Sequence, residues 1–140
     1  MKHILILFLA LSGAAALADN PSPVPTDEVA QNLFAPELVL KYREEIALDA
    51  SQSKALKEMI QKAQAKFLDL QWDMQAETGK LSQLLKARPV DSTAALAQVD
   101  RVLNLEHDVK RAQLGLLIGI KNLLSSAQQD QLIELRRKNP

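Results

Sequence analysis

Residue types that carry metal or acid–base chemistry are few in this chain. It has 140 residues and no cysteine, and beyond residue 18 its single histidine is His107. Glu106 and Asp108 flank this histidine, but neighbouring positions on a helix point about 100° apart, so the three side chains diverge. Beyond residue 18 the soft ligands are Met59 and Met74, too few for a specific transition-metal site. We therefore expect no metal site within one chain and interpret His107 as a surface residue, while a metal ion shared between two chains stays open.

Motifs for covalent or phosphate chemistry are also missing. The sequence has no glycine-rich phosphate loop, no Gly-x-Ser-x-Gly nucleophile elbow and no His-Glu-x-x-His pair. Its 17 basic and 17 acidic residues cancel, so no strongly basic face points to nucleic acid. We expect no enzyme, no catalytic residue, no cofactor and no small-molecule substrate, and we expect a protein that binds other proteins.

The N-terminus has the pattern of a secretory signal. Residues 2–3 give a short basic start, residues 4–16 are apolar apart from one serine and one glycine, and residues 16–18 read Ala-Leu-Ala, a small-x-small cleavage pattern. The apolar stretch is shorter than the roughly 20 residues that a membrane-spanning helix needs. We expect cleavage after Ala18 and a periplasmic protein that begins at Asp19. An uncleaved membrane anchor is the alternative.

The remaining sequence predicts an all-α fold. It contains few glycines and no β-branched alternation from which strands are built. Residues 19–32 contain three prolines among small and polar residues, which predicts a disordered arm. A folded domain is expected over residues 33–138, and its first helix should begin at Pro36 and run to about Leu48.

A long antiparallel helical hairpin is expected in the middle of this domain. From residue 56 to residue 84 the apolar residues follow a 4-3-4-3 spacing, broken only by Glu77. This spacing predicts a helix from Ala50 to about Lys86, roughly 55 Å long at 1.5 Å per residue. Pro89 ends the helix, because proline disfavours helical geometry in the residue before it. Asp91 can cap the next helix, which should run to about residue 124.

The position of the turn predicts which residues of the hairpin lie side by side. If the chain folds back at residues 88–89, residues whose numbers sum to about 177 are neighbours. Glu77 should then lie near Arg101, and Met74 near Leu103. We therefore interpret Glu77 as an ion-paired structural residue.

A repeated motif stands at both ends of this hairpin. Residues 48–52 read Leu-Asp-Ala-Ser-Gln and residues 124–128 read Leu-Ser-Ser-Ala-Gln. In each copy a capping residue ends one helix and begins another, and the glutamine three positions later can complete a capping box. The motif predicts two sharp bends and a short last helix from the second copy to about residue 137. The motif residues are Leu48, Asp49, Gln52, Leu124, Ser125 and Gln128.

With this motif the sequence resembles the Spy/CpxP family of periplasmic stress proteins, whose signature is a repeated Leu-Thr-x-x-Gln and whose relatives include ZraP and CnrX. Here Asp49 and Ser125 replace the threonines, and both are competent helix caps. The resemblance covers about residues 33–138. The helix signals above predict a four-helix chain, in which two short helices flank the hairpin. The resemblance implies that the hairpin is bent, that it dimerises in antiparallel fashion into a thin cradle, and that the protein either binds unfolded proteins without ATP or senses envelope stress.

One segment has more apolar surface than a two-helix hairpin buries. Residues 114–120 read Leu-Gly-Leu-Leu-Ile-Gly-Ile and are apolar on every side. Either the terminal helices cover this band, or it forms a dimer interface or a surface for client proteins. Trp72 lies off the heptad line with Leu68 one turn before it, so it either packs on a terminal helix or belongs to a second apolar face. The candidate dimer or client residues are Trp72, Leu114, Leu116, Leu117, Ile118 and Ile120.

The leading hypothesis is a periplasmic, ATP-independent chaperone that binds unfolded or partially folded proteins and forms a homodimer through part of the 114–120 band. The second hypothesis is a stress or heavy-metal sensor that docks on a membrane signalling protein. A purely structural helical module of the envelope is the third.

Overall fold

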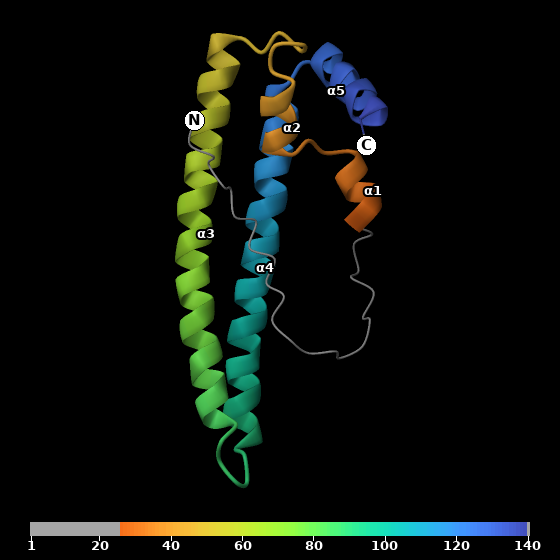
Figure 1. Ribbon diagram of the computed structural model, residues 1–140. Helices are drawn as coiled ribbons and strands as arrows, with labels where there is room; N and C mark the ends of the chain where they lie inside the picture. Colours follow the sequence, from red (N-terminus) through yellow and green to blue (C-terminus); the bar gives the residue numbers. More distant parts are fainter. Residues whose placement is uncertain (1–25, 140) are drawn as a thin grey trace.

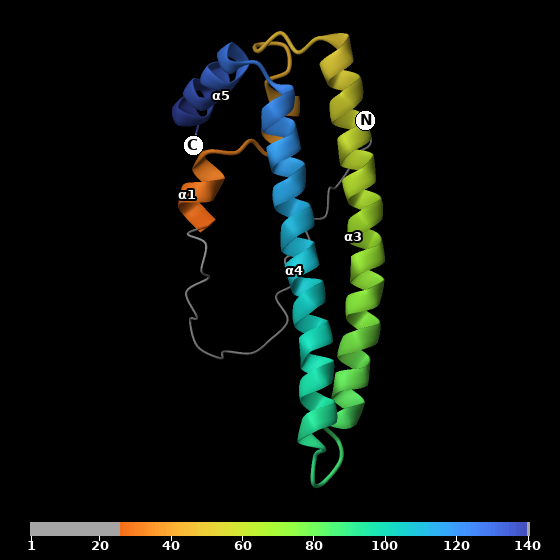
Figure 2. The ribbon, with the colours of Figure 1, turned by 180° about the vertical axis from the view of Figure 1, so that it is seen from behind.

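Five helices make up the computed structural model, which describes residues 26–139. They are α1 (Thr26–Gln31), α2 (Pro36–Lys41), α3 (Ala50–Leu84), α4 (Ser92–Leu123) and α5 (Ser126–Lys138). The described residues contain no strand, which confirms the predicted all-α fold. The long helices α3 and α4 run antiparallel side by side, and α1, α2 and α5 lie around the end far from the hairpin turn (Figures 1 and 2).

The predicted ends of the long helices are confirmed, because each is set by a local signal. The Asp49 carboxylate accepts the amide hydrogen of Gln52 (2.8 Å) and so caps α3. Asp91 caps α4 in the same way by accepting from the Ala94 amide (3.0 Å). α3 ends at Leu84, five residues before Pro89. No helix within residues 26–139 is long and apolar enough to cross a membrane.

The first predicted helix ends earlier than expected. α2 stops at Lys41 instead of continuing to Leu48, and one further turn follows it. The chain then reverses at Ala47, whose φ is 51°. The Leu48 amide donates to the Arg43 carbonyl (2.9 Å) and the Ala47 amide to the Glu44 carbonyl (3.1 Å), which are the two hydrogen bonds of a Schellman motif. The sequence gives no sign of this reversal, since the residue with positive φ is an alanine and not a glycine.

The expected disordered arm contains a short helix. Within the arm that the sequence predicts to be disordered, residues 26–31 form the helix α1, and basic side chains from distant helices lie at its C-terminal end. Arg136 donates to the carbonyl oxygens of Gln31 (2.5 Å) and Leu33 (3.1 Å), and Lys121 donates to that of Asn32 (2.8 Å). Cations stabilise the negative end of a helix. Residues 19–25, the predicted signal at residues 1–18 and its cleavage site lie outside the described residues.

The hydrophobic core lies at one end of the molecule. It joins α2 and the turn after it to the first turns of α3, the last turns of α4, and α5. Burying these side chains fixes the two bends, because each bend brings a short helix back onto the hairpin. The buried members are Phe34, Val39, Tyr42, Ile46, Leu56, Ile120, Leu124 and Leu132.

Beyond this core the hairpin is only two helices thick. Among residues 61–119, only Leu70, Ala95 and Gln98 are buried. The remaining side chains at the contact between the two helices, such as Phe67 and Val102, are half-buried. We call residues 61–119 the hairpin arm. The arm therefore keeps part of its apolar seam in contact with water.

Candidate functional site

The two copies of the repeated motif contact each other directly. The side-chain amide of Gln52 donates to Gln128 Oε1 (2.8 Å), and that of Gln128 donates to Gln52 Oε1 (2.9 Å). Each amide also donates to a backbone carbonyl, Gln52 to Leu123 (3.0 Å) and Gln128 to Ile46 (3.2 Å). The motif glutamines thus fasten both bends to one another.

Each glutamine also completes its own capping box. Gln52 Oε1 accepts from the Asp49 amide (3.2 Å), and Gln128 Oε1 accepts from the Ser125 amide (2.9 Å). Both predicted boxes are confirmed. The pairing of one box with the other was not predicted, because 76 residues separate the two glutamines. The repetition of the glutamine was the signal that could have suggested it.

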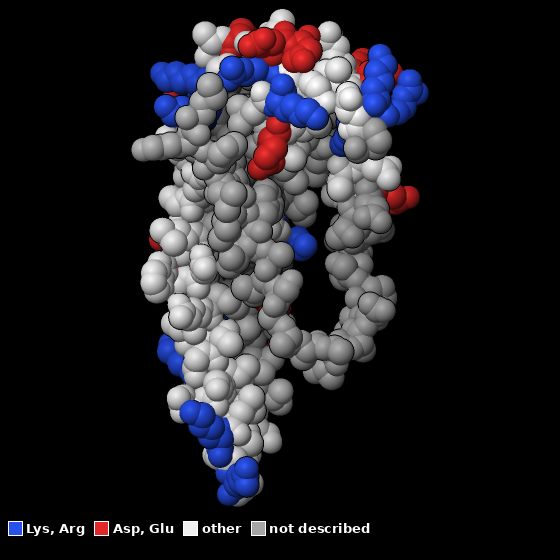
Figure 3. All heavy atoms as spheres, viewed as in Figure 1, with Lys and Arg blue, Asp and Glu red and all other residues white. Residues whose placement is uncertain are grey.

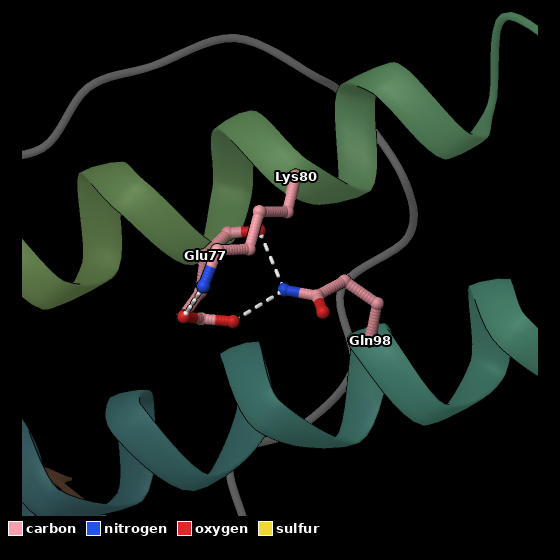
Figure 4. A network of polar contacts seen from close by, with 3 residues as sticks. All are labelled: Glu77, Lys80 and Gln98. Atoms are coloured by element: carbon pink, nitrogen blue, oxygen red, sulfur yellow. Dashed lines mark hydrogen bonds and ion pairs between the residues drawn. The ribbon is translucent and has the colours of Figure 1, made fainter.

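The Glu77 carboxylate interrupts the apolar seam of the arm and is held by two partners (Figure 4). The buried Gln98 amide donates to Glu77 Oε2 (2.6 Å) and to the Glu77 backbone carbonyl (2.9 Å). Lys80 pairs with Glu77 Oε1 (2.5 Å). The hydrogen bonds from Lys80 and Gln98 lower the pKa of Glu77, and the charge of Arg101 adds a smaller effect in the same direction. Glu77 is therefore a paired structural residue, but its main partners are Lys80 and Gln98 and not Arg101.

The contact between Glu77 and Gln98 corrects the predicted register of the hairpin. Their residue numbers sum to 175, two less than the 177 expected for a turn at residues 88–89. In the structure Val102 is half-buried, whereas Leu103, which was expected beside Met74, is 53% exposed. A displacement of one position turns a side chain by about 100° on a helix.

Large apolar side chains are exposed on the face of α4 that points away from α3. Leu96 is 63% exposed, Leu103 follows it seven residues later, and Ile118 is 50% exposed. The half-buried Leu114 lies 18 residues after Leu96, which is five helical turns, so it shares their face. We call these four residues the α4 outer face. These four apolar side chains add little to the core of a single chain, and a row of exposed apolar side chains is typical of a surface that binds another molecule.

The structure separates the candidate dimer or client residues into different environments. Ile120 is fully buried, and Leu116 packs against the core, so both belong to the interior and not to a surface. Close packing was expected over both glycines of this band. It is present at Gly119, where a Cβ would lie 3.5 Å from the Met59 sulfur, but the expectation is wrong for Gly115, where a Cβ would meet no described atom outside its own helix within 4 Å. Leu117 is half-buried. The 114–120 band is thus core on one side and surface on the other, as the contrast between Ile120 and Ile118 illustrates.

Trp72 does not pack on a terminal helix. It is 64% exposed in the middle of α3, and Leu68 one turn before it is exposed as well. The second apolar face suggested by these two residues is therefore present on the surface of the arm.

The donor side chains of residues 26–139 do not fit a resident metal ion in one chain. His107 is exposed and lies 3.6 Å from the Asp108 carboxylate, but no group of three histidine, aspartate or glutamate side chains within the described residues could hold a metal. We therefore assign no metal site to the described residues of one chain.

A shallow apolar pocket of about 290 Å³ lies where the chain passes from the turn after α2 into α3. Leu40, Leu48, Leu56 and Ile60 line it, and Arg43 and Lys57 are among its polar lining residues. The pocket is large enough for one or two apolar side chains.

Comparison with known proteins assigns the family. A family model described as heavy-metal resistance matches residues 4–131, which is 128 of the 140 residues. No curated protein matches the chain. No solved structure matches it either. Since the match spans almost the whole sequence, this chain belongs to the heavy-metal resistance family.

Proposed function

We propose that this protein is a periplasmic, ATP-independent protein-binding module of the Spy/CpxP kind, which holds unfolded or partially folded envelope proteins on its hairpin arm. The observation that carries the proposal is the exposure of Leu96, Leu103 and Ile118 on the α4 outer face. On the opposite side of α4, many side chains in the seam with α3 are only half-buried. Apolar contact is the main source of affinity for an unfolded chain, which offers apolar side chains in no fixed order.

Charges interleave with these apolar residues and suit transient capture. Asp100, Lys110 and Arg111 lie between Leu96 and Ile118 on α4, and all three are exposed. Exposed charges speed association and make it dependent on salt, while contributing little to the affinity of the final complex. A surface with both signs also accepts clients of either net charge.

Suppression of client aggregation tests the proposed activity. The purified protein is mixed at stoichiometric amounts with a denatured client, which is then diluted into buffer, and light scattering follows aggregation. We expect the protein to reduce the scattering without ATP. Unchanged scattering at a twofold molar excess would rule out the chaperone function.

Variants locate the activity on the α4 outer face. Leu96→Gln combined with Leu103→Gln should weaken suppression several-fold, because it removes apolar area without burying a charge. The matched control replaces Leu85 and Ile133 with glutamine, since both are exposed to a similar degree but lie at the hairpin tip and in α5. Equal loss in both pairs would show that the α4 outer face has no special role.

The proposed location has its own test. If residues 1–18 are a cleaved signal, protein recovered from the periplasm should begin at Asp19 when its mass is measured. Recovery of the uncleaved chain from the membrane fraction would instead support the anchor alternative.

The family description favours a second candidate, a stress or heavy-metal sensor that acts on a membrane signalling protein. Its metal-dependent form requires a ligand set that residues 26–139 of one chain do not provide. Calorimetric titration of the metal-free protein with zinc, copper, nickel and cobalt separates the candidates. Binding at micromolar or tighter affinity would favour the sensor, and absence of binding would leave the chaperone as the better proposal.

A further inference from the structure

The apolar pocket between the turn after α2 and α3 has its floor on the hydrophobic core. Among its lining residues, Leu56 is buried within the core, and Leu48 and Ile60 pack against it. Leu40, which is exposed, completes the apolar lining. We call this space of about 290 Å³ the bend pocket. Small-molecule sites begin at about 300 Å³ and are mostly apolar with a few polar groups, so a small ligand of this character suits the bend pocket.

Two basic side chains lie at the rim of the bend pocket. Arg43 comes from the turn after α2 and Lys57 from the second turn of α3, and both line the pocket and are exposed. Because Leu48 and Ile60 are half-buried and Leu56 is buried, these apolar side chains lie deeper than the two cations. None of the described residues that line the pocket is acidic. The bend pocket therefore combines an apolar floor with a positively charged rim.

Both cations of the rim are available to an anion from solution. Arg43 Nη2 lies 3.9 Å from the Glu44 carboxylate, well beyond the roughly 2.7–2.9 Å of a charge-assisted hydrogen bond. Lys57 makes no ion pair within residues 26–139. The space-filling view shows both basic and acidic side chains at the bent end, so the positive charge belongs to the pocket rim and not to this whole end of the molecule (Figure 3).

The walls of the bend pocket offer few hydrogen-bond partners to a ligand. The Leu48 amide already donates to the Arg43 carbonyl (2.9 Å), and the Ser53 amide donates to the Asp49 carbonyl (2.9 Å). The other lining residues of α3 lie inside the helix, where their amides bond to the preceding turn. The uncharged polar lining residues, Ser53 and Gln61, are exposed. Since buried polar groups without partners are costly, a ligand whose buried part is a hydrocarbon chain suits this pocket better than a peptide does.

We propose that the bend pocket binds a medium-chain fatty acid, whose hydrocarbon chain lies on Leu48, Leu56 and Ile60 and whose carboxylate lies between Arg43 and Lys57. The planar guanidinium of an arginine matches a carboxylate through two parallel hydrogen bonds, and the lysine ammonium adds a second positive charge. At about 30 Å³ for a group the size of a water molecule, 290 Å³ holds a chain of about eight to ten carbons. The pocket shares no residue with the α4 outer face, so this inference does not rest on the proposed chaperone function.

Calorimetric titration of the purified protein with fatty acids of increasing length tests the size of the site. Decanoate should bind at one site per chain with a dissociation constant of about 0.1–1 mM, because so small a ligand gains limited affinity. From hexanoate to decanoate the dissociation constant should fall about two- to fourfold with each methylene and then level off, since longer chains extend into solvent. Absence of saturable binding up to about 5 mM decanoate, or affinity that keeps rising at the same rate beyond dodecanoate, would overturn the proposal.

A comparison of octanoate with octanol, matched in chain length, tests the role of the two cations. In an NMR titration followed at the Ile60 methyl groups, Arg43→Gln combined with Lys57→Gln should raise the dissociation constant of octanoate at least tenfold and change that of octanol less than about threefold. The matched control is Lys86→Gln combined with Arg88→Gln, two exposed basic residues of the hairpin tip, which should change neither. Equal weakening of octanoate by both pairs, or of octanoate and octanol by the first pair, would overturn the assignment of the carboxylate to Arg43 and Lys57.

Filling the bend pocket tests its position without changing any charge. Ser53 is an exposed lining residue, so Ser53→Phe should place an aromatic ring in the pocket and abolish decanoate binding. Ser51→Phe is the control, because Ser51 is exposed in the same helical turn but does not line the pocket. Circular dichroism should show the same helix content in both variants. Unchanged decanoate binding by Ser53→Phe, or equal loss in both variants, would overturn the bend pocket as the site.

Two further titrations distinguish this site from other modes of binding. Leu96→Gln combined with Leu103→Gln should bind decanoate as the unmodified protein does, because neither residue lines the bend pocket. A tenfold loss of decanoate affinity in that variant would overturn the proposed site. A short peptide that ends in an apolar residue with a free carboxylate should bind more weakly than decanoate, because its amide groups would lack partners in the pocket. Tighter binding of the peptide would overturn the choice of a fatty acid.

Discussion

The side-chain amides of Gln52 and Gln128 connect the two bends through four hydrogen bonds. Two more close the capping box of each glutamine within its own bend. Replacement of Gln128 with alanine would remove the side-chain partner of the Ile46 carbonyl and of the Ser125 amide, and one of the two acceptors of the Gln52 amide. Since unsatisfied buried polar groups cost about 1–3 kcal/mol, we expect Gln128→Ala to lower the free energy of unfolding by about 2–3 kcal/mol. Urea denaturation measures this, with Gln131→Ala, an exposed residue of α5, as the control.

A double-mutant cycle separates the pair from its backbone contacts. If Gln52 and Gln128 act together, the double alanine variant should lose at least about 1 kcal/mol less than the sum of the two single variants. Additive losses would mean that each glutamine serves only its own capping box.

The lowered pKa of Glu77 gives the stability of the arm a pH dependence of known sign. Its ordinary value is 4.5, and the folded state binds the proton more weakly than the unfolded state. The contribution of Glu77 is therefore fully present above about pH 4.5 and is lost as the pH falls through the lowered folded pKa. We expect the free energy of unfolding of Glu77→Gln, measured by chemical denaturation, to fall less steeply between pH 4.5 and pH 3 than that of the unmodified protein. Glu58→Gln, at an exposed position of the same helix, should keep the slope of the unmodified protein.

Ala47 is held in the left-handed region, where the Cβ of alanine is crowded. Ala47→Gly should raise the free energy of unfolding by about 1 kcal/mol. Ala97→Gly, at an exposed position inside α4, should lower it by about the same amount. A thermal unfolding midpoint that falls for Ala47→Gly would show that this reversal is not part of the folded state.

At the scale of elements, burial in the hydrophobic core holds the short helices α2 and α5 in place. The hairpin arm adds few residues to this core. Leu132→Ala removes a fully buried side chain and should cost about 2–5 kcal/mol. Leu81→Ala on the half-buried seam of the arm should cost about 1–2 kcal/mol, because less area is lost. If denaturant unfolding showed that both variants lose a similar amount of unfolding free energy, the claim that the core is confined to one end would be contradicted.

Elements with local signals could be predicted from the sequence, and those fixed by distant contacts could not. Asp49, Asp91 and Ser125 mark the starts of α3, α4 and α5 because each caps its own helix. α1 escaped prediction because Arg136, more than 100 residues away, holds its end. The early end of α2 escaped because Ala47 carries no glycine signal.

The candidate surface was predicted in part for the same reason. The spacing of apolar residues identified the seam, but the turn expected at residues 88–89 placed Leu103 beside Met74, whereas Val102 is half-buried and Leu103 is exposed. Likewise, the 114–120 band looked uniformly apolar in sequence, whereas the core takes Ile120 and leaves Ile118 outside. A shift of one position along a helix is enough to exchange core and surface.

At the scale of the whole molecule, the bent end provides stability and the hairpin arm provides surface. A chain of 140 residues that stretches two helices into a thin arm exposes more apolar area than a globule of equal length would. Within the heavy-metal resistance family, this division is the basis of the proposed function. The proposed function assigns protein binding to the arm, and we expect substitutions in the arm to lower the free energy of unfolding less than substitutions in the bent end.

Amide hydrogen exchange with and without a denatured client tests this account most directly. It measures, for each segment, whether a bound client protects the backbone from exchange. We predict that the client slows exchange over residues 96–118 of α4 and leaves α5 and the bends unchanged. Protection confined to the bent end, or no protection anywhere at saturating client, would contradict the claim that the hairpin arm is the protein-binding surface.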